Sequence, residues 1–245
     1  MKIAIISDIH ANLPAFEETL KSIDENEVDV IYCLGDLVGY NVWPNAVINE
    51  IRKRKIPTIA GNHDVKAVEI NKSKTTSDNS NIAYQMIAKN HIDFLSDLPA
   101  HIKLEFKIAN SSVNMLLVHG SPYSNTEYLF ENRDEKEIID IFQKSETDIL
   151  VCGHTHIPYH RILNKNNESE NHFHLINAGS VGKPKDGNPK SCYAIITIDT
   201  KTSKFDKESI SVKFIRVKYN IDKVAEAIEN SELPNNYVEM LRKAI

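Results

Sequence analysis

Five short apolar segments of the sequence each lead into a turn that carries Asp, Asn or His side chains. These segments are residues 2–7, 30–34, 57–60, 113–118 and 149–152. Short apolar runs that are bounded by turns predict buried strands rather than helices. Helical patterns separate the first three runs, and strands that alternate with helices predict a parallel sheet. Because ligands gather at the carboxyl ends of such strands, we expect the polar turns to converge in one crevice.

The rest of the chain supplies further strands and helices. Expected strands cover residues 102–109, 159–163, 173–176, 193–198 and 211–217, and residues 102–109 and 113–118 form a hairpin. Expected helices follow Asn12-Leu13-Pro14 and cover residues 44–54, 82–88, 92–95, 134–143, 221–228 and 234–244. The polar stretch 71–81 predicts a loop. We interpret residues 65–100 as a helical and loop insertion that covers part of a site, and residues 218–245 as C-terminal helices.

Composition limits the class of protein. With 245 residues, 41% hydrophobic and 26% charged, the chain predicts a single globular domain over residues 1–245. A net charge of −5 argues against binding of long nucleic acid. No apolar run exceeds five residues, which argues against a membrane helix of about 20 residues and against a secretory signal. Three widely spaced cysteines without a C-x-x-C motif predict reduced thiols and a cytoplasmic protein.

The polar turns contain more metal-ligand side chains than one zinc ion needs. These candidates are Asp8, His10, Asp36, Asn62, His119, His154 and His156. Asp36 follows the middle of the three early strands, where a carboxylate could bridge two cations. Two carboxylates leave a residual positive charge beside two divalent ions, and that charge would attract phosphate despite the negative net charge of the chain.

In their order along the chain, these turns resemble the motifs of one family. The motifs D-x-H, G-D-x-x-G, G-N-H-D, H-G and G-H-T-H occur here at Asp8–His10, Gly35–Gly39, Gly61–Asp64, His119–Gly120 and Gly153–His156. This series resembles the calcineurin-like metallophosphoesterase superfamily over roughly residues 1 to 198. Each motif is short and weak alone, but five of them in order at strand ends are a strong signal.

The resemblance implies an α/β fold, a four-layer αββα sandwich of two mixed β-sheets flanked by helices. It also implies a dinuclear site with three groups of residues. Asp8, His10 and His156 would hold the first metal, Asn62, His119 and His154 would hold the second, and Asp36 would bridge them. His63 would remain free as the catalytic acid or phosphate contact. The implied activity is hydrolysis of a phosphodiester or nucleotide by a metal-bridging hydroxide, with Mn²⁺ as the expected metal and Fe or Zn²⁺ as alternatives.

Departures from the family pattern narrow the subclass. No arginine follows the G-D motif, although protein phosphatases and symmetrical dinucleoside-tetraphosphate hydrolases have one there. The G-D-x-V-G-Y segment and residues 177–182, N-A-G-S-V-G, resemble a small bacterial and archaeal branch. That branch includes phosphodiesterases and asymmetrical dinucleoside-polyphosphate hydrolases. Relatives often have proline and arginine where this chain has Ala178 and Lys185, and lysine would bind a distal phosphate less specifically.

Several interpretations remain open from the sequence. Tyr40, Trp43 and Tyr123 could stack on a nucleobase or could simply pack, and Lys185 could contact substrate. A catalytically silent scaffold or binding protein that retains the fold is the alternative to an enzyme, and a nuclease is a third hypothesis that the negative charge disfavours. The sequence does not identify the substrate, the native metal or the oligomeric state.

Overall fold

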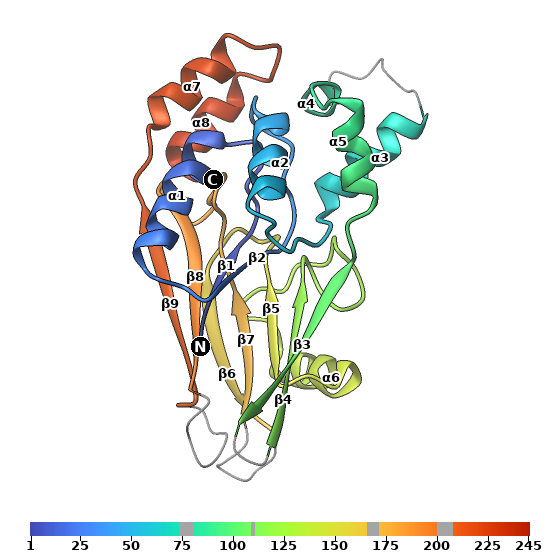
Figure 1. Ribbon diagram of the computed structural model, residues 1–245, viewed down its shortest axis with the longest axis vertical. Helices are drawn as coiled ribbons and strands as arrows, with labels where there is room; N and C mark the ends of the chain where they lie inside the picture. The colour runs from blue at the N-terminus through green and yellow to red at the C-terminus, as the bar shows by residue number, and fades with distance from the viewer. Residues whose placement is uncertain (74–80, 109–110, 166–171, 200–207) are drawn as a thin grey trace.

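Two β-sheets pack face to face in the computed structural model, which describes residues 1–73, 81–108, 111–165, 172–199 and 208–245 (Figure 1). The described strands are β1 (Lys2–Ile6), β2 (Val30–Cys33), β3 (His101–Ile108), β4 (Ser111–Val118), β5 (Ile149–Cys152), β6 (Tyr159–Asn164), β7 (His172–Asn177), β8 (Ser191–Ile198) and β9 (Ile210–Val217). The described helices are α1 (Leu13–Glu25), α2 (Pro44–Lys53), α3 (Asn62–Ser73), α4 (Ile82–Gln85), α5 (Lys89–Ser96), α6 (Glu135–Ser145), α7 (Ile221–Glu229) and α8 (Asn236–Lys243).

Both sheets are mixed, as the family resemblance predicts. The first has the strand order β2-β1-β8-β9, in which β1 and β2 are parallel and the other pairs are antiparallel. The second has the order β3-β4-β5-β7-β6, with β4, β5 and β7 parallel and antiparallel strands at both edges. The parallel strands of each sheet therefore have a common carboxyl end, and at that end their turns can meet.

Three apolar layers explain the four-layer arrangement. Ile3 and Ile5 of β1 face the core between the two sheets, whereas Ala4 and Ile6 face the core beneath α1 and α2. This alternation follows from the two-residue period of a strand, and it buries β1 on both faces. A third core lies between the outer face of the second sheet and α6, and Phe142 of α6 belongs to this core. The predicted αββα sandwich is confirmed.

The chain differs from the sequence prediction at two places. Residues 57–60 form only one isolated bridge, between Thr58 and Cys33 of β2, because the segment leaves the sheet at once to enter α3. Helix α3 itself was not expected, since its first turn coincides with the G-N-H-D motif and its amphipathic pattern is weak. It extends through Ser73 into the predicted loop 71–81, of which residues 74–80 lie outside the described residues.

Helices from the two ends of the chain meet above the carboxyl ends of the strands (Figure 1). Val224 and Ile228 of α7 and Leu241 of α8 form an apolar cluster with Ala83 of α4. The C-terminal helices thus contact the 65–100 segment, whose role as an insertion remains a prediction. Among the described helices, we find none with the length and apolar character that crossing a membrane demands.

Candidate metal centre

The candidate ligands converge because each follows the carboxyl end of a strand or begins α3. Asp8 and His10 follow β1, and Asp36 follows β2. His119 follows β4 and His154 follows β5. Three groups of these side chains place one ligand atom each within 4.8 Å of one another: Asp8, His10 and His156; Asp36, His119 and His154; and His10, Asp36 and His63.

The backbone of these turns has an unusual conformation. Asp8, His10, Asp36, His154 and His156 have φ angles of 53°, 48°, 53°, 64° and 61°. Residues other than glycine rarely adopt this left-handed region, and holding one there costs about 1–3 kcal/mol unless the surroundings compensate. Such strain is typical of functional sites, where the direction of a side chain matters more than local stability.

The first group contains nitrogen lone pairs that face one another. Nδ1 of His10 donates to the carbonyl oxygen of Val38 at 3.0 Å, and Nδ1 of His156 donates to that of Lys183. A carbonyl oxygen only accepts hydrogen bonds, so Nδ1 of each ring carries the hydrogen, and Nε2 presents a lone pair whenever the ring is neutral. These two Nε2 atoms lie 3.2 Å apart, and Oδ1 of Asp8 lies 3.1 Å from Nε2 of His156. Converging lone pairs of this kind suit a cation between them.

In the second group, Asp36, His119 and His154, a backbone carbonyl again holds one ring nitrogen and the other nitrogen faces the group. Nδ1 of His119 donates to the carbonyl oxygen of Leu34 at 2.8 Å. Its Nε2 lies 3.0 Å from Oδ1 of Asn62 and 3.4 Å from Oδ2 of Asp36. The ring of His154 lies beside that of His119, with 5.1 Å between their centroids. Nε2 of His154 is 3.2 Å from the carbonyl oxygen of Thr126, which leaves Nδ1 for the group.

In each of the two carboxylates, of Asp8 and Asp36, one oxygen is hydrogen-bonded within the protein and the other is not. Oδ2 of Asp8 accepts from Oγ of Ser7 at 2.6 Å and from the backbone N–H of His154 at 3.0 Å. Oδ1 of Asp36 accepts from the backbone N–H of His63 at 2.8 Å. The other oxygens, Oδ1 of Asp8 and Oδ2 of Asp36, are buried without a hydrogen-bond partner. A buried carboxylate oxygen is costly to leave unpaired, and each of these faces a group of imidazole nitrogens. The donor set therefore fits divalent cations.

The electrostatics of the centre also favour added positive charge. Burial opposes ionisation of Asp8 and Asp36, but the neighbouring histidines outweigh it and lower the pKa of both carboxyls. Burial lowers the pKa of His119, but the Asp36 and Asp8 carboxylates raise it more, to about 10. Burial lowers the pKa of His156 to about 4, so this ring is neutral at pH 7, the form in which imidazole can bind a metal.

Asp64 holds two of these turns together. Its carboxylate accepts from the backbone N–H groups of Asp36 at 2.8 Å, Leu37 at 2.9 Å and Gly61 at 3.0 Å. Burial and the Asp36 charge raise its pKa to about 7. The bond to Gly61 follows the capping-box pattern, in which the third residue of a helix reaches back to the residue before the helix. The sequence has Gly61 where a capping box usually has Ser or Thr, and the role of Asp64 was not predicted.

Gly61 allows the Asp36 turn to approach α3. A Cβ atom at this position would lie 2.1 Å from Oδ1 and 2.3 Å from the backbone nitrogen of Asp36. Both atoms are fixed by hydrogen bonds, so a larger residue would displace the carboxylate.

His63 lies beside the candidate ligands. Its ring makes an edge contact with that of His10, with 4.9 Å between centroids. Its Nδ1 lies 2.6 Å from the hydroxyl oxygen of Tyr84 in α4, a contact that no sequence pattern indicated. Burial lowers the pKa of His63 to about 3, so the ring is neutral at pH 7.

The three predicted substrate contacts differ in their surroundings. The ring of Tyr40 lies 4.8 Å from that of His10 and 5.0 Å from that of His63, at the edge of the centre. The backbone N–H of Lys185 donates to the carbonyl oxygen of His156 at 3.4 Å. Burial lowers the pKa of its ammonium, and the charges of Asp8 and Asp36 act in the opposite direction. Trp43 instead packs against the apolar cluster of α7 and α8.

Three further side chains near the centre were not predicted. Tyr128 stacks on His154 with 4.1 Å between centroids, and Tyr237 of α8 contacts Tyr40 at 5.2 Å. The ammonium of Lys183 lies 4.8 Å from the centre of the Tyr40 ring, and burial together with Lys185 lowers its pKa to about 8. Lys183 lies two residues before Lys185 in the sequence. No local pattern indicated Tyr237, because α8 is far away along the chain.

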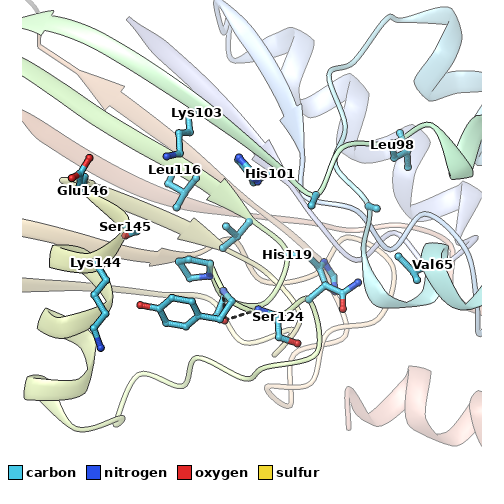
Figure 2. A pocket seen from close by; sticks show the side chains of 17 residues that line it. Val65, Leu98, His101, Lys103, Leu116, His119, Ser124, Lys144, Ser145 and Glu146 are labelled. Carbon is cyan, nitrogen blue, oxygen red and sulfur yellow. Dashed lines mark hydrogen bonds between the residues drawn. The ribbon is translucent and has the colours of Figure 1, made fainter.

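A cavity of about 520 Å³ runs along β3 and β4 and reaches His119 at one end (Figure 2). His101, Lys103 and Leu116 line its strand side, and Lys144 lies opposite. Tyr123 also lines the cavity. Of the seven candidate ligands, only His119 lines this cavity. The cavity therefore lies beside the candidate metal centre rather than over it.

Comparison with known proteins agrees with this geometry. Residues 1–201 match the calcineurin-like phosphoesterase superfamily domain. The chain belongs to this superfamily. It is therefore a metal-dependent phosphoric ester hydrolase, as the motifs predict.

Relatives and solved structures of this family cover most of the chain. It is 31% identical to an uncharacterized protein of Methanocaldococcus jannaschii, MJ0912, over 95% of this chain and 93% of the relative. It is 28% identical to the phosphodiesterase YfcE of Escherichia coli K12, over 78% of this chain and 85% of YfcE. A metallophosphoesterase structure from Sphaerobacter thermophilus has a TM-score of 0.74 and 28% identity, with 100% of both chains covered. The structure of PH1004 from Pyrococcus horikoshii has a TM-score of 0.80 and 20% identity, covers 100% of this chain and 98% of that one, and supports the fold alone.

Proposed function

We propose that the protein is a dinuclear phosphodiesterase for small phosphodiester or nucleotide substrates. Asp8, His10 and His156 hold one cation, and Asn62, His119 and His154 hold the other. Asp36 lies between the two sets. The observation that carries the proposal is the pair of buried, unpaired oxygens, Oδ1 of Asp8 and Oδ2 of Asp36, which face these imidazole nitrogens.

The donor set indicates the kind of metal. Imidazole nitrogens mixed with carboxylate and amide oxygens suit Mn²⁺, Fe or Zn²⁺, and Mn²⁺ is our proposed cofactor. When bound, two such cations lower the pKa of a water molecule and neutralise charge on the phosphoryl oxygens. The protein contributes their placement, through histidines whose Nδ1–H groups are held by backbone carbonyls.

His63 is the proposed acid of the reaction. It adjoins His10 without belonging to either proposed ligand set, and the hydroxyl of Tyr84 holds its Nδ1. The ring is neutral at pH 7 in the free protein, so it must first take up a proton, and the negative charge of a bound phosphate would favour this. Its remaining nitrogen, Nε2, can then give a proton to the leaving oxygen. An imidazole within hydrogen-bond reach of the leaving oxygen is suited to this role.

Basic side chains support binding of phosphate. Lys183 and Lys185 lie in the segment after residue 182. Lys183 is buried with its ammonium over the ring of Tyr40, and Lys185 is half-buried. Two divalent cations exceed the charge of the two carboxylates, so the centre attracts anions although the whole chain carries −5. The name of the relative YfcE, a phosphodiesterase, supports a diester as the substrate class.

The decisive experiment measures activity and metal content together. Metal-free protein is loaded with Mn²⁺, Fe²⁺ or Zn²⁺, analysed for bound metal, and assayed with bis-p-nitrophenyl phosphate and p-nitrophenyl phosphate. We expect two metal ions per chain and faster hydrolysis of the diester. A folded protein that is inactive with every metal would instead be a catalytically silent scaffold, and an active protein with one ion would contradict the dinuclear assignment.

A further inference from the structure

Two aromatic side chains remain half exposed beside the metal centre. Tyr128 stacks on His154 with an interplanar angle of 19°, and Phe130 stacks on Tyr128 with 5.4 Å between centroids and an angle of 11°. The exposed fractions of Tyr128 and Phe130 are 46% and 45%. A series of nearly parallel rings therefore leads from a proposed metal ligand toward solvent.

The backbone that carries these rings is firmly held. Leu129, which lies between them, is buried in the core under α6, and its carbonyl oxygen accepts from the Tyr159 hydroxyl at 2.6 Å. Nη1 of Arg161 donates to the carbonyl oxygens of Glu131 at 2.9 Å and Arg133 at 2.6 Å. The backbone that carries the rings is thus ordered before any ligand arrives, and this reduces the conformational entropy that the protein loses when a ligand binds.

This placement differs from that of an ordinary packed aromatic residue. Leu129 already supplies the apolar contact that fixes the segment, so the fold does not need the two neighbouring rings for its core. Exposed aromatic faces next to a site are typical of ligand recognition, because a flat ligand can cover them. The cavity along β3 and β4 is a weaker candidate, since His119 is the only proposed ligand that lines it.

We propose that Tyr128 and Phe130 form a stacking platform for the nucleobase of a nucleotide or nucleoside phosphodiester. The inference rests on the proposed function, because the metal centre is taken to bind the phosphate of the same molecule. His154 connects the two subsites: it is a proposed metal ligand, and its ring is the first of the stack. The platform thereby narrows the substrate class from phosphodiesters in general to those with an aromatic base.

The chemistry of the platform also predicts how bases are discriminated. Its recognition surface consists of ring faces and one hydroxyl, that of Tyr128. Stacking accepts every base, and it strengthens with the area of the base. We therefore expect purine nucleotides to bind more tightly than pyrimidine nucleotides, with little distinction between adenine and guanine.

The test compares ligands that differ only by the base. AMP and ribose 5-phosphate are titrated by calorimetry into the metal-loaded protein, and KM values replace dissociation constants if either is hydrolysed. Base stacking on aromatic side chains corresponds to about a 5- to 150-fold difference in affinity. We expect AMP to bind more tightly by a factor in this range, Phe130→Ala to remove most of the difference, and Phe130→Trp to retain it.

Tyr123→Ala is the matched control. Tyr123 is 58% exposed in the same segment after β4, but it lines the neighbouring cavity and has no ring contact with Tyr128. The Tyr123→Ala protein should still bind AMP more tightly than ribose 5-phosphate. Equal affinity for AMP and ribose 5-phosphate in the wild type, or an unchanged preference in Phe130→Ala, would overturn the platform. If AMP binds through Phe130 but no phosphoester is hydrolysed, the platform stands and the proposed function is wrong.

Discussion

The hydroxyl oxygen of Tyr84 lies 2.6 Å from Nδ1 of His63, within hydrogen-bonding distance. Tyr84 belongs to α4, within the segment 65–100, whereas His63 belongs to the first turn of α3. Gly39 also approaches the imidazole so closely that a Cβ atom there would lie 2.7 Å from the same Nδ1. A neutral hydroxyl thus holds the proposed acid, and there is no room for a larger side chain at Gly39.

Tyr84→Phe tests this contact. Loss of one hydrogen bond of about 0.5–1.5 kcal/mol should lower kcat/KM for diesters with alkyl leaving groups about 2- to 10-fold. Esters of p-nitrophenol should be affected less, because that leaving group departs without a proton. The measurement is a double-mutant cycle with His63→Ala, in which Tyr84→Phe should have no further effect. An equal loss in both backgrounds would show that Tyr84 acts independently of His63.

His63→Ala should separate proton donation from metal binding. We expect both metals to be retained, while kcat/KM for alkyl or nucleoside esters falls by about 10²–10⁴. Turnover of p-nitrophenyl esters should fall much less, and comparison of the two substrate types is the measurement. Similar losses for both would indicate that His63 contacts the phosphoryl oxygens. Loss of metal would make His63 a ligand, an assignment that its proximity to His10 and Asp36 also permits.

Asp36→Asn should weaken both metal positions together. The substitution removes the charge and replaces the unpaired Oδ2, but the amide oxygen can still accept from the backbone N–H of His63. Elemental analysis at limiting metal should give less than full occupancy of both sites. Asp93→Asn, an exposed change on α5, is the matched control. Two metals bound with wild-type affinity in Asp36→Asn would rule out a bridging role.

His174 should make the metal-free protein less stable in acid. It is fully buried in β7, 3.0 Å from His160, and burial lowers its pKa to about 3 from an ordinary 6.5. Between these values the unfolded chain binds a proton that the folded chain does not. The free energy of unfolding therefore falls as the pH drops below 6.5, by up to about 1.4 kcal/mol per pH unit from this group.

Chemical denaturation between pH 7 and pH 5 measures this effect. His174→Gln should show a smaller decrease in the free energy of unfolding than the wild type over this range, whatever its stability at pH 7. His101→Asn, an exposed change in β3, should retain the wild-type slope. If His174→Gln also retained that slope, the burial of His174 would not be the source of the acid sensitivity.

β5 was predictable from the sequence because burial on two faces leaves a clear local signal. β5 begins at Ile149 and ends at Cys152, as predicted, and all four of its residues are buried. Helix α3 was not predictable in the same way, because its first turn is occupied by Asn62 and His63 rather than by an apolar stripe. There, the hydrogen bonds that Asp64 makes to the neighbouring turn replace the pattern that sequence reasoning relies on.

The sequence by itself determined the fold class, the family and the residues proposed as ligands. Each motif is local, and the shared direction of parallel strands brings the motif ends together without further information. Only the tertiary structure decided what surrounds them: Tyr84 against His63, and Tyr128 against His154 with Phe130 stacked upon it. These aromatic side chains come from segments with no motif of their own. Their positions depend on how the helices and loops pack above the sheets, and packing between distant segments leaves no periodic pattern in the chain.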